Sequence, residues 1–141
     1  MAEILIDATI LICAYDRSAP QKQQRALQIL DRLATAGTGA VSTHVLLAFG
    51  AAALDRLGNV LTPKTIEERI ARFSGIFTVL PVTLPVIRTG LRGVRDHQLE
   101  FWDAQIWATA WAYHIPLVLS ETLQDGTVAE GVRFENPLRG L

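Results

Sequence analysis

The sequence predicts a single α/β domain in which a mainly parallel sheet carries helices on both faces. Short apolar segments typical of strands alternate along the chain with longer segments whose apolar residues recur at helical spacing. The first of these strands, Ile4–Ile6, is almost unbroken in its apolar character, which is typical of a central strand covered on both sides. A length of 141 residues fits one domain with a substantial core. Alternation of this kind predicts a parallel sheet between helices.

The first half of the chain is expected to contain two strands and three helices. Pro20 should lie in the first turn of a long helix, where its missing N–H has no partner to lose, and Gly37 should end that helix. Ser42 or Thr43 is expected to cap the next helix. The expected elements are the strand Ile4–Ile6, a helix over Thr9–Tyr15, the helix that begins at Pro20, a strand at Ala40 and Val41, and a helix over Val45–Leu57.

The second half continues the alternation. Thr62 and Pro63 have the order typical of an N-cap and a first helical position. A late helix over Leu99–Tyr113 places Asp103 on the same face as an apolar stripe, because residues three or four apart share a helix face. The expected elements are helices over Pro63–Phe73, Pro85–Arg95 and Leu99–Tyr113, and strands over Phe77–Val82, Pro116–Leu119 and Val132–Phe134.

The composition of the chain narrows the classes of function that it can have. The 13 basic and 14 acidic residues nearly balance, so the chain lacks the basic surplus typical of many nucleic-acid binders. No apolar run approaches the length of a membrane span, and the first residues make a poor signal peptide. The single cysteine, Cys13, lies among apolar residues and is expected to be a buried, inert thiol, which agrees with a cytoplasmic location.

Acidic residues follow the strands at the end where parallel sheets bind ligands. Asp7 follows the first strand, and Glu121 and Asp125 follow the strand that ends at Leu119. Since the carboxyl ends of parallel strands share one edge of the sheet, these acids are expected to lie together, with Asp103 entering from the start of its helix. The alternative is structural, with Asp7 as an N-cap and the later acids as solvated turn residues.

A group of carboxylates without a basic surplus indicates a cation, because clustered carboxylates repel one another. Hard oxygen ligands suit Mg²⁺ or Mn²⁺, which bridge to phosphate oxygens and activate water for phosphodiester hydrolysis. Zinc-type spacing of cysteine and histidine is absent, as are a glycine-rich phosphate loop and a Gly-x-Ser-x-Gly motif. The histidines are assigned no chemistry.

Five segments in this order resemble a PIN domain, and within that family they resemble the VapC-type toxins of bacterial toxin–antitoxin pairs. The resemblance covers essentially the whole chain and is carried by Ile6–Leu11, Val41–Leu46, Phe101–Ala104, Leu119–Gly126 and Gly131–Pro137. It implies a three-layer α/β/α sandwich and Mg²⁺- or Mn²⁺-dependent endoribonuclease activity on RNA. It also implies a homodimer and a cognate antitoxin that neutralises the protein. The lack of a long apolar run, noted above, predicts no membrane association.

The resemblance also implies a set of site residues. Asp7 and Asp103 match two aspartates of the family's acidic set, and Asp125 matches one common in the VapC branch, so all three are expected to be catalytic and to bind the metal. Ala48 and Thr122 stand where the family usually has further acids. A domain that retains the fold and binds an antitoxin or RNA without cutting it is therefore the alternative.

Other side chains are candidates for supporting roles. Glu121, Thr9 and Ser120 flank the acids and could position water or phosphate, although a helix cap and a strand end are equally good interpretations of Thr9 and Ser120. Arg92 and Arg95, with Arg88, form a stripe that would contact RNA phosphates, unless it is an ordinary solvated helix face. Trp102, Trp107 and Trp111 are expected to pack in the core or in a dimer contact rather than to serve as platforms for base stacking. Apolar faces on the helices between Asp16 and Leu33 and after Thr43 are candidates for an antitoxin groove, with core packing as the default.

Overall fold

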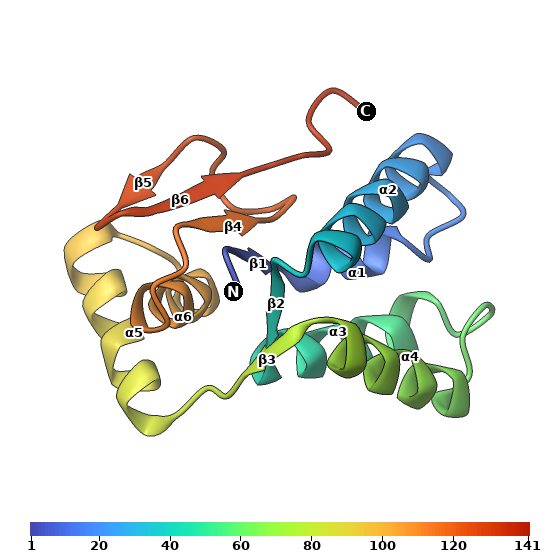
Figure 1. Cartoon of the computed structure of the whole chain (residues 1–141), viewed down its shortest axis with the longest axis horizontal. Helices are drawn as coiled ribbons and strands as arrows, with labels where there is room; N and C mark the ends of the chain where they lie inside the picture. Colours follow the sequence, from blue (N-terminus) through green and yellow to red (C-terminus); the bar gives the residue numbers. More distant parts are fainter.

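The computed structural model describes residues 1–141 and shows a six-stranded sheet with helices on both faces (Figure 1). The elements follow one another in nearly the predicted alternation. They are β1 (Ile4–Ile6), α1 (Ala8–Cys13), α2 (Pro20–Ala36), β2 (Gly39–Ser42), α3 (Thr43–Arg56), α4 (Pro63–Ile76), β3 (Thr78–Leu80), α5 (Leu84–His97), α6 (Phe101–Ala112), β4 (Leu117–Leu119), β5 (Val128–Ala129) and β6 (Val132–Glu135).

The strand order is β3-β2-β1-β4-β6-β5, so the first strand of the chain lies in the middle of the sheet. All neighbouring strands are parallel except β5 and β6, which form an antiparallel pair. In the central pair Ile6 lies opposite Leu119, and the N–H of Asp7 donates to the carbonyl oxygen of Leu119 at 2.9 Å. The residues that follow β1 and β4 therefore begin side by side at one edge of the sheet.

Two hydrophobic cores lie on opposite faces of the sheet. Successive residues of a strand point to opposite faces, so Leu5 belongs to one core and Ile6 to the other, and Val118 and Leu119 are divided in the same way. Helices α1–α4 cover the Ile6 face, and α5 and α6 cover the Leu5 face (Figure 1). This confirms the predicted α/β sandwich with a central, mainly parallel sheet.

The differences from the predicted elements have local causes. The late helix begins at Phe101 and not at Leu99, because the side chain of Glu100 accepts hydrogen bonds from the N–H groups of Trp102 and Asp103 and so caps it. Strand β5 was not expected from the sequence. It has only two residues and depends on pairing with β6 across the tight turn at Glu130 and Gly131, both of which have positive φ.

The tryptophans do not all lie in the core as expected. Trp107 is fully buried, and its indole N–H donates to the carbonyl oxygen of Ala129 at 3.0 Å. Trp102 is 57% exposed and Trp111 is 40% exposed, so neither ring lies in the core of this chain, and a dimer contact for them stays a prediction. The expectation of a core role is therefore correct for Trp107 alone.

Cys13 is buried, as the sequence predicts. Burial, with the nearby Glu121 carboxylate, raises the pKa of this thiol to about 11. The reactive thiolate is therefore scarce at neutral pH, which agrees with an inert role. None of the helices combines the length and the apolar character needed to cross a membrane.

Candidate active site

A cavity of about 570 Å³ lies at the edge of the sheet where β1 and β4 end. Its wall is formed by α1, α3 and α6 and by the turn that follows β4. Asp7 and Asp103 both line this cavity, as the convergence of strand ends predicts. The elements that carry them are far apart in the sequence, and the parallel pairing of β1 with β4 and the packing of α6 bring them together.

Asp7 is held in place by two hydroxyl groups. Its side chain is only 6% exposed, and its Oδ2 accepts hydrogen bonds from Thr9 Oγ1 and Ser120 Oγ, each at 2.8 Å. Thr9 Oγ1 also accepts from the N–H of Glu121 at 3.0 Å, which joins α1 to the turn after β4. Asp7 occupies the N-cap position of α1, but its side chain makes no capping bond. The carboxylate is therefore oriented for something other than capping.

Ser120 connects Asp7 to the backbone around it. This residue is fully buried, and its hydroxyl oxygen accepts from the N–H groups of Thr122 and Leu123 at 3.2 and 3.3 Å. Its proton is thereby directed toward Asp7 Oδ2. A buried polar group with all its partners present specifies one geometry, so Thr9 and Ser120 act on the site through Asp7.

Asp103 is a carboxylate without a neutralising partner. It lies in the first turn of α6, and its side chain accepts no hydrogen bond and forms no ion pair. Burial raises its pKa above the ordinary value, and the negative charges of Glu100 and Asp7 raise it further. Asp7 and Asp103 thus bring two negative charges to one cavity, an arrangement that a bound cation would stabilise.

This pair of carboxylates fits Mg²⁺ or Mn²⁺. Magnesium keeps several of its waters and is commonly held by one or two carboxylates together with substrate phosphates. Asp103 offers both its oxygens, and Asp7 keeps Oδ1 free of protein hydrogen bonds. No group of three or more acidic, histidine or cysteine side chains is arranged to hold a metal, so the protein would supply two carboxylates.

Two further polar side chains, which the sequence did not indicate as site residues, line this cavity. His44 lies in the first turn of α3, two residues after the end of β2, and its Nδ1 is buried without a hydrogen-bond partner. Burial lowers the pKa of His44, and the nearby charge of Asp7 opposes that shift. Arg56 brings a positive charge to the wall from the end of α3. The sequence signal that could have identified His44 was its position shortly after the end of β2, at the same edge of the sheet as Asp7.

The two positions that depart from the family pattern also lie in this wall. Ala48 projects from α3 and Thr122 from the turn after β4, and both line the cavity with Asp7 and Asp103. A carboxylate at either position would face the same space. The two positions at which the resemblance implies further acids thus border the same cavity as Asp7 and Asp103.

Asp125 lies outside this cavity wall. Its Oδ1 accepts from the N–H of Asn136 at 2.8 Å, and its Oδ2 accepts from Arg139 Nη1 at 2.8 Å. These two contacts lower the pKa of the carboxyl group. Glu121 likewise faces elsewhere, with its carboxylate paired to Lys22 and accepting from the Cys13 thiol at 3.6 Å. Metal binding by Asp125 stays a prediction, because the structure brings only Asp7 and Asp103 together.

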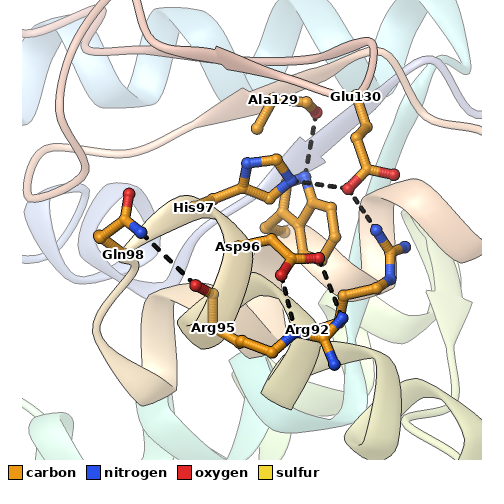
Figure 2. Close-up of polar contacts among 8 residues, drawn as sticks. Arg92, Arg95, Asp96, His97, Gln98, Ala129 and Glu130 are labelled. Carbon is orange, nitrogen blue, oxygen red and sulfur yellow. Dashed lines mark hydrogen bonds and ion pairs between the residues drawn. The ribbon is translucent and has the colours of Figure 1, made fainter.

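The arginine stripe on α5 makes contacts within the protein (Figure 2). Arg92 pairs with Glu130 and lies over the rings of Trp107 and Trp111, at 5.1 and 4.7 Å from their centroids. Arg95 pairs with its neighbour Asp96 at 2.7 Å. The Arg92–Glu130 pair ties α5 to the β5–β6 turn, whereas the Arg95–Asp96 pair lies within α5. RNA binding by Arg92 and Arg95 stays a prediction.

The fold and this cavity define an α/β protein of PIN-like architecture with a two-carboxylate site at the carboxyl edge of its sheet. The sequence matches no protein-family model and no curated protein. Solved structures do match the fold over nearly the full chain, and this confirms the predicted PIN-like fold.

Three of these structures are toxins or toxin–antitoxin complexes. VapC20 of Mycobacterium tuberculosis, a Sarcin-Ricin loop cleaving toxin, matches with a TM-score of 0.63 and 18% identity over 82% of this chain and 86% of that one. A toxin-antitoxin complex from Klebsiella pneumoniae matches with a TM-score of 0.68 and 18% identity over 95% and 97% of the two chains. DNA-bound VapBC from Salmonella typhimurium matches with a TM-score of 0.66 and 15% identity over 97% and 99%.

Proposed function

We propose that this protein is a Mg²⁺- or Mn²⁺-dependent endoribonuclease and the toxin of a toxin–antitoxin pair. The observation that carries the proposal is the pairing of Asp7 and Asp103 in one cavity, with no ion pair to neutralise either carboxylate. The metal, when bound, would neutralise charge on the scissile phosphate and lower the pKa of a bound water. Asp7 and Asp103 are the residues that would hold it.

The chain's own residues have distinct tasks in this proposal. Thr9 and Ser120 hold the carboxylate of Asp7 in one orientation, so that its ligand geometry exists before metal or RNA arrives. Arg56 offers a positive charge at the cavity wall to an RNA phosphate. Asp125 contributes through the segment it holds, since its contacts with Asn136 and Arg139 fix the chain that follows β6.

The solved structures of the same fold support RNA as substrate and an antitoxin as partner. One is described as a toxin that cleaves the Sarcin-Ricin loop, and others contain toxin–antitoxin complexes. We extend both properties to this chain, together with a homodimer and a cytoplasmic location. A groove of about 290 Å³ between α3 and α4, with Leu54, Ile66 and Ile70 in its wall, would receive apolar side chains of an antitoxin helix.

A non-catalytic binding domain is the second candidate. Ala48 and Thr122 occupy the cavity wall without carboxylates, so only two acids remain to hold the metal and to orient an attacking water. A domain of this kind would fold, pair with its antitoxin and bind RNA without cutting it.

Cleavage of a labelled structured RNA by the purified protein decides between the two candidates. The reaction is run with Mg²⁺, with Mn²⁺ and with EDTA, for the wild type, for Asp103→Asn, and for Asp31→Asn as a matched control. Asp31 is an exposed aspartate on α2, outside the cavity wall. We expect cleavage that requires the metal, disappears in Asp103→Asn and persists in Asp31→Asn. No cleavage of several RNAs by the folded wild type would favour the binding domain.

A further inference from the structure

A second cavity adjoins the acidic one. It has a volume of about 380 Å³, which is within the range of about 300–1,000 Å³ typical of small-molecule sites. His44, Leu47 and Trp102 line both cavities, so a ligand that occupies the acidic cavity can extend directly into the second one. The remaining wall comes from Thr43 at the start of α3, from α5 and α6, and from Val82 before α5.

A flat aromatic pair stands where the two cavities meet. The rings of His44 and Trp102 are nearly parallel, at an interplanar angle of 10° and a centroid separation of 5.3 Å. Trp102 remains 57% exposed although it is bordered by His44 and Phe101. An exposed indole held parallel to a second ring offers a surface on which another planar ring can stack.

The wall of the second cavity also contains a polar side chain with an unused acceptor. Gln105 is 4% exposed, and its Nε2 donates to the carbonyl oxygen of Ile87 at 3.1 Å, but its Oε1 has no partner. The amide fits because residue 90 is glycine, since a Cβ there would lie 2.1 Å from Gln105 Nε2. A buried acceptor without a hydrogen bond costs free energy of folding, and a ligand with an N–H group would supply the missing donor.

We propose that the second cavity binds one unpaired base of an RNA whose neighbouring phosphate occupies the acidic cavity. The base stacks against the His44–Trp102 pair, and one of its N–H groups meets Gln105 Oε1. This inference rests on the proposed function, because it describes the site that would select a base of the RNA substrate. A base meets all the observed features at once, because it is planar, has N–H groups and is linked directly to a phosphate, whereas an apolar protein side chain would leave Gln105 unpaired.

The test measures RNA binding apart from cleavage. Fluorescence anisotropy gives the affinity for labelled six-nucleotide oligo(rA), oligo(rC) and oligo(rU), with Ca²⁺ in place of Mg²⁺ as an oxygen-binding cation. Each oligonucleotide is also used with one base at a time removed, leaving the phosphates intact. The proteins are the wild type, Trp102→Ala, Trp102→Phe and a control, Leu84→Ala, whose leucine is exposed on α5 outside both cavities.

We expect Trp102→Ala to weaken binding by about 5- to 150-fold, the range for loss of one stacked base. Trp102→Phe retains a ring and is expected to keep most of the affinity, and Leu84→Ala is expected to bind as the wild type does. Removing the base at one position should weaken wild-type binding by at least a similar factor, because the bond to Gln105 is lost together with the stacking. The same removal should cost clearly less in Trp102→Ala.

Each other outcome has a definite meaning. Equal affinities of Trp102→Ala and Leu84→Ala, or no penalty for a removed base, overturn the base site even if metal-dependent cleavage is found. Binding that depends on Trp102 without any cleavage supports the base site and overturns the nuclease proposal. A loss of dimer in Trp102→Ala with unchanged RNA affinity would show that this face contacts a second copy or another protein, which also overturns the base site.

Discussion

Replacing Asp103 with asparagine should change stability in opposite directions with and without metal. The pKa of Asp103 is higher in the folded protein than in the unfolded one. The carboxyl group therefore stabilises the fold fully only at a pH below its unfolded pKa. This contribution is lost as the pH rises through the folded pKa. At pH 7 its charge therefore opposes folding. Because the side chain is partly exposed, removing the charge should add no more than about 1 kcal/mol to the free energy of unfolding.

The temperature scale follows from chain length. For 141 residues, an unfolding entropy of about 2.1 cal/mol/K per residue converts 1 kcal/mol into about 3 °C of Tm. The metal-free Asp103→Asn protein should therefore unfold at or up to about 3 °C above the wild type. A metal present at 100 times its Kd stabilises a protein by about 2.7 kcal/mol, so the wild type should gain about 9 °C. Asp103→Asn should gain only a small part of this.

Differential scanning calorimetry at pH 7 with EDTA, Mg²⁺ and Mn²⁺ measures both effects. Asp31→Asn is the matched control, because its aspartate is exposed and outside the cavity wall, and it should shift with metal as the wild type does. Asp125→Asn tests the predicted metal binding by Asp125, which lies outside the cavity wall, because a reduced metal shift would show that this carboxylate also holds the metal. The reasoning would be refuted if Asp103→Asn kept the full metal shift or if it lowered the Tm of the metal-free protein by several degrees.

Three further substitutions test the site and its support. Ala48→Glu adds a carboxylate to the cavity and should raise metal affinity and cleavage rate, as measured by calorimetric titration and RNA cleavage. Ser120→Ala leaves two backbone N–H groups without a partner and leaves Asp7 Oδ2 with Thr9 as its one donor, so chemical denaturation should show a loss of about 2–3 kcal/mol together with weaker metal binding. Gly90→Ala forces the Gln105 amide to move, and overpacking of about 1–3 kcal/mol should outweigh a helix-propensity gain of about 1 kcal/mol.

Controls for these substitutions come from the same chain. Ser74→Ala removes an exposed hydroxyl that donates only to the carbonyl of Ile70 and should change stability by less than about 0.5 kcal/mol. Gly75→Ala adds a Cβ that meets nothing within 4 Å and should be neutral or stabilising. If Gly90→Ala were as stable as Gly75→Ala, the close fit of Gln105 against α5 would be disproved. An Ala48→Glu protein with unchanged activity would show that the missing acid does not limit the reaction.

Most of the fold could be predicted because its elements carry local signals. The apolar run Ile4–Ile6, the prolines at the starts of α2 and α4, and the left-handed Gly37 that ends α2 act within a few residues, and each element lies close to its predicted position. Strand β5 carries no such signal. Two residues cannot form a strand alone, and β5 exists because β6 supplies its hydrogen-bond partners.

The acidic site was predicted where the parallel sheet itself dictates the geometry. Asp7 follows β1 directly, and the position of Asp103 depends on how α6 packs across the Leu5 face, which the buried Ile106 and Trp107 determine. Asp125 comes six residues after β4, and its course depends on side-chain contacts with Asn136 and Arg139 that no local pattern encodes. That is why the grouping of Asp7 with Asp103 could be predicted and the place of Asp125 could not.

The sequence by itself determined the order of the strands and helices, the α/β class and the two carboxylates at the end of the sheet. These depend on periodicity, on caps and on the rule that parallel strands end at the same edge. Only the tertiary structure decided which side chains complete the cavity. Ser120 bonds to Asp7, His44 stacks on Trp102 and Gln105 fits against Gly90 across long separations in the chain. Contacts of this kind depend on the packing of whole elements, so they become visible only once the sheet and its helices are assembled.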